Sequence, residues 1–163
     1  MIDAALFKSG MRRLAAGVCL VTATDRDGLR QGLVATSVIS VTVEPPSLLV
    51  CVNKAASCHD PIADSGAFCV NLLADADDEV ARRFGSSAAR DSRFADRQWR
   101  ALETGAPALD GALASFDCRV STRVPVGSHT IFIGAVVALA LRPGTVAPLL
   151  YLDGDFARLA SPS

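Results

Sequence analysis

Residues 32–59 read GLVATSVISVTVEPPSLLVCVNKAASCH and predict a strand, a rigid Pro45-Pro46 corner and a second strand. Along the first strand, apolar residues share one face at a period of two, as in a half-buried strand: Leu33, Ala35, Ile39, Val41 and Val43. Ser37 interrupts this face. The second strand leads into a small polar loop, residues 53–57, and then into a short helix expected over residues 59–63.

Polar groups gather in this loop and at the end of the first strand. Strand-end hydroxyls, Lys54, Ser57 and free backbone N–H groups ahead of a helix could bind a phosphate. A buried hairpin with a polar exit loop explains the same pattern without any ligand. From these residues alone both interpretations stand, and the second is the simpler one.

The composition is that of an apolar globular protein. The 163 residues suit a single domain spanning residues 1–163, and half of them are hydrophobic. The net charge of −1 lacks the basic excess of nucleic-acid-binding domains, so no nucleic-acid partner is expected. A chain with so little charge is expected to hide part of its surface in an oligomer.

The cysteine pattern indicates a reducing compartment. The five cysteines contain no C-x-x-C pair, and Cys19, Cys51, Cys69 and Cys118 lie in apolar, strand-like runs. A cytoplasmic location is therefore expected. The N-terminal residues show no signal-peptide pattern. The longest apolar run, residues 131–141, is shorter than the ~20 residues that span a bilayer, so no membrane association is expected.

The remaining pattern predicts more strands than helices. Asp3 caps a first helix that continues until Gly17, and a second helix covers residues 75–84. Further strands are expected over residues 18–24, 67–73, 113–124, 128–141 and 149–152. A mobile surface loop (85–98) and a connection (104–111) lie between them. In strand 113–124, Ser115 and Asp117 are expected to face away from the apolar side. These elements indicate a closed or partly closed antiparallel barrel.

Few residues offer themselves as catalysts. The sequence has no nucleophile elbow, zinc-protease motif, Walker loop or dinucleotide fingerprint. The Cys58-His59 pair lacks a second ligand cluster, so no metal site is expected. His129 follows a glycine turn and precedes a buried strand. It is either a functional side chain or a strand-edge histidine bonded to the backbone.

Nine segments, taken together and in order, resemble the flavin reductase family. They are GVCLVT (17–22), GLVATSVISV (32–41), PPSLLVCVN (45–53), Ser57, FCVNLL (68–73), RRF (82–84) with Arg93-Phe94, GALASFDC (111–118), GSHTIFIG (127–134) and LLYLDGDF (149–156). Within the family, the chain is most similar to the small reductase components of two-component flavin-dependent monooxygenases, including aromatic-ring hydroxylases such as 4-hydroxyphenylacetate 3-monooxygenase.

The resemblance implies a mostly β fold with flanking helices: an antiparallel Greek-key split β-barrel of the FMN-binding type, normally a homodimer with both subunits at the flavin site. It implies that NADH, or NADPH, reduces FMN or FAD, and that the reduced flavin passes to a partner monooxygenase. Because the cofactors carry the chemistry, the protein needs to position them more than it needs an acid–base pair.

The resemblance also assigns residues. The segment lining the flavin comprises Ala35, Thr36, Ser37 and Val38, with Ser37 near the phosphate. A second segment on the phosphate side comprises Asn53, Lys54 and Ser57, and the loop residues near the cofactor are Arg93 and Phe94, with Tyr151 close by. His129 matches the histidine beside the nicotinamide, although Ser128 stands where the family most often has Asp. Two other functions remain open: a non-enzymatic flavin- or haem-binding carrier or sensor, and an interaction barrel without a cofactor.

Overall fold

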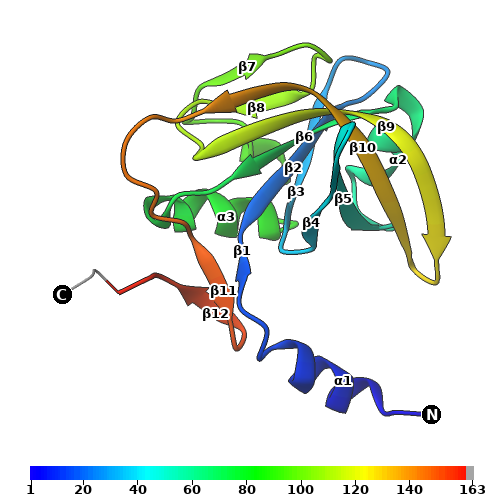
Figure 1. The fold of residues 1–163 in the computed structure, drawn as a ribbon, viewed down its shortest axis with the longest axis vertical. Coiled ribbons are helices and arrows are strands. Elements are labelled where there is room, and N and C mark those ends of the chain that lie inside the picture. The colour runs from blue at the N-terminus through cyan, green and yellow to red at the C-terminus, as the bar shows by residue number, and fades with distance from the viewer. Residues whose placement is uncertain (161–163) are drawn as a thin grey trace.

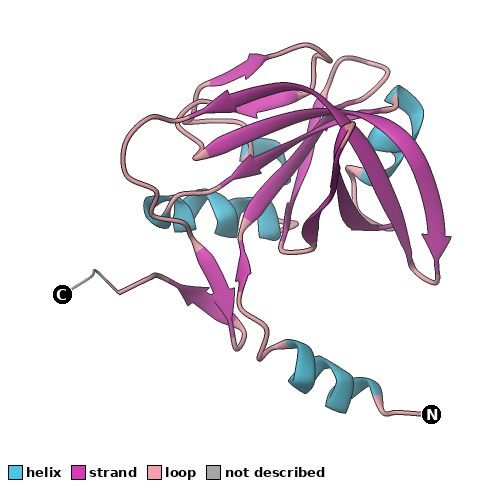
Figure 2. Cartoon of the chain, in the orientation of Figure 1, coloured by secondary structure: helices cyan, strands magenta, loops and turns pink. Residues whose placement is uncertain are grey.

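The computed structural model describes residues 1–160 and is dominated by antiparallel strands (Figures 1 and 2). The strands are β1 (Ala16–Gly17), β2 (Cys19–Thr24), β3 (Arg30–Ala35), β4 (Val38–Val43), β5 (Pro46–Asn53), β6 (Ala67–Leu72), β7 (Trp99–Ala101), β8 (Pro107–Leu109), β9 (Ala114–Val126), β10 (His129–Leu141), β11 (Leu150–Leu152) and β12 (Asp155–Ala157). The helices are α1 (Ala4–Met11), α2 (His59–Ser65) and α3 (Asp78–Gly85), with short 3₁₀ turns at Asp75–Asp77 and Arg90–Ser92.

The principal sheet curls into a barrel that is split between β3 and β4. Its seven strands follow the order β3-β2-β6-β9-β10-β5-β4, so β3 and β4 form its two edges. Only Thr36 and Ser37 separate these edge strands in the chain. Because consecutive Cα atoms are about 3.8 Å apart, this short link brings the two edges together. The sequence pattern predicted one continuous strand here, which is wrong. The break places Thr36 and Ser37 at the seam of the barrel.

The barrel interior holds the main core. Its fully buried members include Val21, Val50, Val52, Phe68 and Phe132, which come from β2, β5, β6 and β10. Gly134 is required on β10, because an added Cβ would lie 2.7 Å from atoms of Cys118 and Phe68. The five cysteines are all free thiols.

The apolar face predicted for the first strand does not continue into the core. Ala35 is buried, but Ile39, Val41 and Val43 on β4 are 61%, 46% and 81% exposed. Val38 and Ser40 pair with the buried Val50 and Leu48, so Ile39 lies on the opposite face of β4. A register shift between Ser40 and Thr42 then breaks the predicted period of two. These side chains are exposed because β4 is an edge strand beyond the seam.

The first helix is shorter than predicted and lies apart from the barrel (Figure 1). Asp3 caps it as expected and accepts a hydrogen bond from the backbone N–H of Leu6 at 3.3 Å. The helix ends at Met11, and Gly17 belongs to β1, which pairs with β11. None of its residues is buried. So short a helix is marginal by itself, and tertiary contacts must stabilise it.

A hairpin that the pattern missed covers β9. Strand β8 lies within the predicted connection 104–111 and pairs with β7, which follows the predicted loop 85–98. Ser115 and Asp117 on β9 are buried rather than solvent-facing. Asp117 accepts hydrogen bonds from the backbone N–H groups of Glu103 and Thr104 at 2.8 and 2.7 Å. Asp117 is buried because it binds the backbone of the added hairpin, whereas the Ser115 hydroxyl donates to Oδ1 of the buried Asn71 at 2.8 Å. The chain also continues past β11 into β12, which pairs with it.

The second predicted helix is confirmed over Asp75–Asp77 and α3, and α2 also forms where expected. Helix α3 packs on β3, and Phe84 fills the space beside Gly32. None of the helices within residues 1–160 has the length and apolar character needed to cross a membrane.

Candidate functional site

Arg93 lies at the centre of a cation-lined cavity beside the loop that follows β5. Its Nη1 donates to the carbonyl of Gly32 at 2.9 Å and to the Ser57 hydroxyl at 3.4 Å, and its Nη2 donates to the carbonyl of Ser86 at 3.0 Å. Its Nε is buried and has no hydrogen-bond partner within the described residues. A buried donor without a partner is costly, so this guanidinium is suited to receive a ligand acceptor.

The cavity has a volume of 380 Å³ and is positively charged. Its lining includes Ser57, Ser87, Arg90 and Arg93 and contains no Asp or Glu. Burial, followed by the nearby Arg90, lowers the pKa of the Arg93 guanidinium. An arginine nonetheless keeps its proton in proteins. Within residues 1–160 neither guanidinium has a carboxylate partner. Together with the two hydroxyl groups they suit an anion, because a phosphate offers several acceptor oxygens and a compensating charge.

The seam of the barrel borders two further cavities. Thr36, Ser37, Val38 and Tyr151 line a largely apolar cavity of 730 Å³ between α1 and the barrel. Ala35, Thr36 and Tyr151 line a cavity of 580 Å³ next to α3. The hydroxyl of Ser37 donates to the carbonyl of Cys51 at 3.1 Å. Ser37 therefore lines a different cavity from Ser57, although the resemblance placed both on the phosphate side of the flavin.

A third group of predicted residues meets where β5 ends and β10 begins. His129 lies directly opposite Asn53 in the antiparallel ladder. The Lys54 ammonium donates to the carbonyl of Gly127 at 2.8 Å, which ties the loop after β5 to the β9–β10 turn. His129 is exposed, and its Nδ1 lies 2.9 Å from the Ser128 hydroxyl. This imidazole is available to a ligand at the barrel rim.

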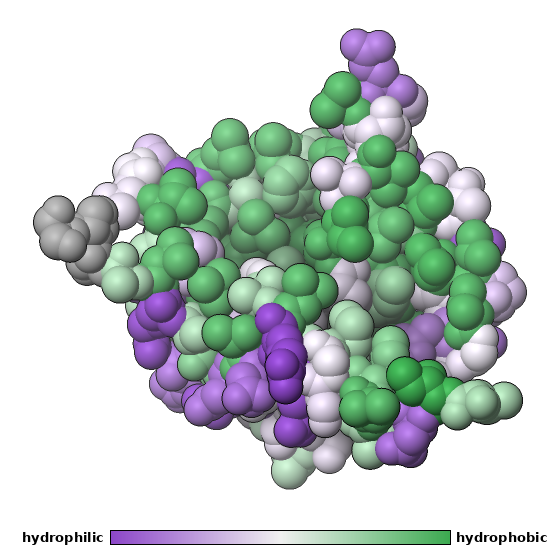
Figure 3. Space-filling model, turned by 60° about the horizontal axis from the view of Figure 1, so that its bottom comes forward, coloured by the Kyte–Doolittle hydropathy of each residue, from purple (hydrophilic) through white to green (hydrophobic). Residues whose placement is uncertain are grey.

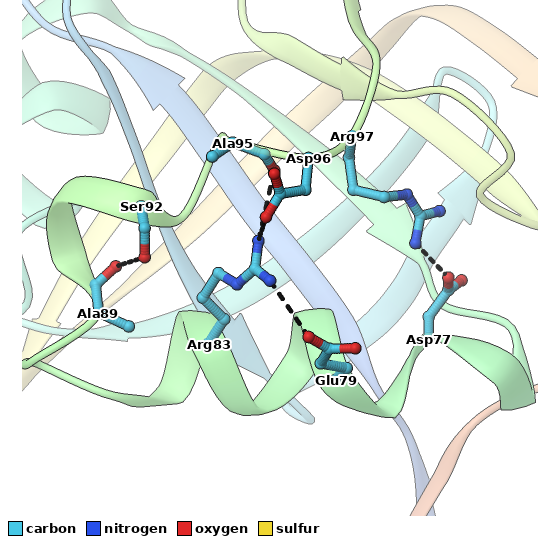
Figure 4. A network of polar contacts seen from close by, with 8 residues as sticks. All are labelled: Asp77, Glu79, Arg83, Ala89, Ser92, Ala95, Asp96 and Arg97. Atoms are coloured by element: carbon cyan, nitrogen blue, oxygen red, sulfur yellow. Dashed lines mark hydrogen bonds and ion pairs between the residues drawn. The ribbon is translucent and has the colours of Figure 1, made fainter.

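The segment that carries Arg93 is anchored to α3 (Figure 4). Arg83 forms an ion pair with Asp96 at 3.1 Å, and Arg97 forms one with the buried Asp77 at 2.7 Å. Phe94 packs against Phe84 and Trp99, with ring centroids 5.2 and 4.8 Å apart. These contacts attach Phe94, Asp96 and Arg97 to the protein, while most of residues 86–98 are exposed, as expected of a surface loop. Phe94 supports the neighbouring Arg93 from the core side.

His59, which the sequence pattern set aside as a weak metal ligand, has partners within the protein. Its Nε2 lies 2.9 Å from the Thr130 hydroxyl and its Nδ1 lies 2.8 Å from Asp60. Its ring is tilted against that of Phe132, with centroids 5.5 Å apart. The histidine thus links α2 to β10, the strand that carries His129.

A family model described as "Flavin reductase like domain" matches residues 11–160. The chain belongs to the flavin reductase family. The FMN reductase (NADH) RutF of Methylorubrum populi is 45% identical over 158 residues, which cover 97% of this chain and 77% of that protein. The resemblance inferred from the nine sequence segments is therefore confirmed.

Solved flavin reductase structures share the whole fold. The Streptomyces globisporus C-1027 NADH:FAD oxidoreductase SgcE6, in complex with NAD and FAD fragments, is similar with a TM-score of 0.88 and 30% identity, covering 97% of this chain and 93% of that chain. A homologue of nitrilotriacetate monooxygenase component B from Mycobacterium thermoresistibile has a TM-score of 0.90 and 30% identity, covering 99% and 91% of the two chains. The split-barrel fold class predicted from the sequence is confirmed.

Several residues that line this flavin reductase's cavities were missed by sequence reasoning: Arg82, Ser86, Ser87, Arg90, Asp155 and Phe156. One signal could have identified Arg90, since it precedes Arg93 by one helical turn in an otherwise small and polar segment. Asp155 and Phe156 belong to β12, which no pattern predicted.

Proposed function

We propose that the protein is an NADH:flavin oxidoreductase that reduces FMN or FAD and releases reduced flavin to a separate monooxygenase. The observation that carries this proposal is the half-buried Arg93 guanidinium, whose buried Nε has no partner within the described residues, in a cavity without carboxylates. The phosphate of a flavin nucleotide supplies the acceptor oxygens and the negative charge that this site lacks. The seam residues would then lie beside the rest of the flavin.

Each group of residues has a separate task in this proposal. A bound flavin would supply the hydride acceptor, and a bound nicotinamide the hydride donor. Arg93, Arg90 and Ser57 hold the flavin phosphate, and the segment from Ala35 to Val38 contacts the flavin at the seam. His129 and Asn53 lie at the rim, where His129 positions the nicotinamide. Stacking the two rings closely and in register lowers the barrier because the reactants are already oriented.

The protein is proposed to act as a homodimer. Large apolar side chains remain exposed in the single chain, on and just after α1, on β4 and on the end of β10: Leu6, Phe7, Met11, Leu14, Ile39, Val41, Val43, Val137, Leu139 and Leu141. Figure 3 shows apolar side chains gathered around a hollow on this side of the molecule. Single chains rarely expose so much contiguous apolar surface, so a second copy is the proposed cover. Light scattering coupled to size-exclusion chromatography tests this directly.

Partner and location follow from the same proposal. The solved relatives include a homologue of a monooxygenase component, and a flavin reductase supplies a reduced cofactor that an oxygenase consumes. Free thiols at all five cysteines suit a cytoplasmic protein. Oxygenation that depends on both proteins, when this reductase is mixed with a flavin-dependent monooxygenase, tests the transfer.

The first experiment is steady-state oxidation of NADH and NADPH by the purified protein with no flavin, riboflavin, FMN or FAD added. Turnover that rises with free flavin and saturates supports the reductase, and the panel identifies both cofactors. A folded protein that binds flavin but shows no turnover in any combination contradicts the proposal, and a flavin carrier then explains the site. A folded protein that binds no flavin contradicts both.

A further inference from the structure

The cavity next to α3 holds a group of side chains that the proposed hydride transfer does not use. It has a volume of 580 Å³, within the range of about 300–1,000 Å³ typical of small-molecule sites. Its outer part is formed by Arg82 of α3 and by Asp155 and Phe156 of β12. The cavity shares Val34 and Gly85 with the anion cavity around Arg93, so the two are neighbours.

Flat, delocalised surfaces line this outer part. The guanidinium carbon of Arg82 lies 4.7 Å from the centroid of the Phe156 ring. Tyr151 meets Phe156 edge-on at a centroid distance of 5.9 Å, which fixes the ring against the paired strand. Guanidinium planes and aromatic faces are the surfaces on which nucleic-acid bases stack.

Asp155 adds a hydrogen-bond acceptor to the outer part of this cavity. Its Oδ1 accepts the backbone N–H of Phe156 at 2.8 Å and lies 3.7 Å from Nη2 of Arg82. Its Oδ2 makes no hydrogen bond within residues 1–160, and the side chain is 80% exposed. An ionised carboxylate accepts hydrogen bonds only, so it suits the hydroxyl pair of a ribose and repels a ribose phosphate.

We propose that this cavity binds the adenosine half of a dinucleotide, with the base against Phe156 and Arg82 and the ribose hydroxyls on Asp155. The assignment rests on the proposed function, because for FAD it places the phosphates in the adjoining cavity with Arg90 and Arg93, and for NADH it places the adenosine next to the flavin phosphate held there. Two dinucleotides share this chemistry: FAD, bound through its adenosine, and NADH. The Asp155 carboxylate favours a ribose without a phosphate. If the bound dinucleotide is NADH, this carboxylate therefore sets a preference for NADH over NADPH.

The test compares Phe156→Leu and Asp155→Asn with wild type, using Asp153→Asn as the matched control. Asp153 lies in the same turn, is exposed and does not line the cavity, and asparagine tolerates its φ of +51°. Dissociation constants for FMN and FAD come from flavin fluorescence, and KM values for NADH and NADPH from turnover. Thermal unfolding of each variant shows whether it is folded.

If the adenosine is that of FAD, Phe156→Leu raises the FAD dissociation constant about tenfold while FMN binding is unchanged. If it is that of NADH, KM for NADH rises about tenfold without a change for either flavin, and Asp155→Asn moves the NADH preference toward NADPH by a similar factor. Asp153→Asn changes none of these constants.

Two results would overturn the proposal. Equal weakening of FMN and FAD by Phe156→Leu would mean that the cavity holds the flavin ring itself. Unchanged constants in both folded variants would mean that it holds no nucleotide. A wild-type protein without any turnover would refute the proposed function but not the adenosine site. The dissociation constants for FMN and FAD can still be compared between wild type and the variants in that case.

Discussion

The guanidinium of Arg93 donates to the hydroxyl of Ser57 at 3.4 Å, and this contact joins two segments that are 36 residues apart in the chain. Ser57 ends the loop that follows β5, and Arg93 lies in the segment anchored to α3. Neither residue is catalytic by type. Their meeting at a cavity without carboxylates is what we propose as the phosphate site.

Replacing Arg93 by methionine should remove phosphate recognition. The dissociation constant for FMN should rise at least tenfold, toward the value for riboflavin, because a hydrogen bond to a charged group contributes about 1.5–3 kcal/mol. Riboflavin has no phosphate, so its affinity should stay as in wild type. Flavin fluorescence titration measures both, and Arg100→Met, which removes an exposed arginine on β7, serves as a control. Equal weakening of FMN and riboflavin would show that Arg93 only supports the fold.

A negative charge at the seam should abolish flavin binding. In Ser37→Asp, the hydroxyl that donates to the carbonyl of Cys51 is replaced by a carboxylate that cannot donate. We expect FMN binding to be lost while the dimer, measured by light scattering, survives. Ser37→Ala is the control, because it removes the hydrogen bond without adding charge.

The affinity of Ser37→Asp for riboflavin shows which part of the bound flavin lies beside residue 37. If Ser37 lies beside the phosphate, Ser37→Asp binds riboflavin normally; if it lies beside the ring, riboflavin is lost as well. Retained affinity for FMN in Ser37→Asp would remove Ser37 from the site altogether.

His129→Ala should impair the reaction with NADH more than the binding of flavin. The imidazole is exposed at the rim opposite Asn53, so its removal leaves the core intact. We expect kcat/KM for NADH to fall by about tenfold, a loss of about 1.4 kcal/mol in transition-state stabilisation, with the FMN dissociation constant unchanged. Ser128→Ala separates the role of the imidazole from that of its 2.9 Å hydroxyl neighbour. An unchanged kcat/KM would mean that His129 is only a strand-edge residue.

Local pattern predicted the elements well and their connections poorly. Alternation in residues 32–43 identified extended structure, yet it could not reveal that the chain crosses from one sheet edge to the other at Thr36 and Ser37. That crossing is a property of the closed barrel. Ala35 and Val38 both contact the barrel core although they are three residues apart, so the alternation changes phase at the seam. The short strands β7, β8 and β12 escaped prediction since three residues carry too little periodicity.

The residues of the candidate site were likewise predicted only in part. The family resemblance named Ser57, Arg93 and Tyr151, and each of these lines a cavity in the structure. It also named Phe94, which packs into the second core beside Phe84. Arg90 and Asp155 escaped notice because exposed charges on a surface segment carry no periodic signal, and only the fold places them beside the other cavity residues.

Alkaline pH should destabilise the protein through its buried thiols. Burial raises the pKa of Cys19, Cys58 and Cys118 from 9.0 to about 12, and it raises the pKa of Cys69 as well. Below pH 9 these thiols are neutral in both the folded and unfolded states. As the pH rises from 9 toward about 12, the unfolded chain loses protons that the folded chain retains. The free energy of unfolding should therefore fall, by up to about 1.4 kcal/mol per pH unit for each thiol.

Urea denaturation under reducing conditions, from about pH 8 to about pH 10.5, measures this fall. Cys58→Ala is the matched variant, because it removes one fully buried thiol from the barrel core. Its stability at neutral pH should be lower than that of wild type, since a buried side chain is shortened. Its decline above pH 9 should be shallower by the contribution of that one thiol. A wild-type profile that stays flat through this range would show that the folded thiols ionise as readily as the unfolded ones, and that the barrel core is open to water.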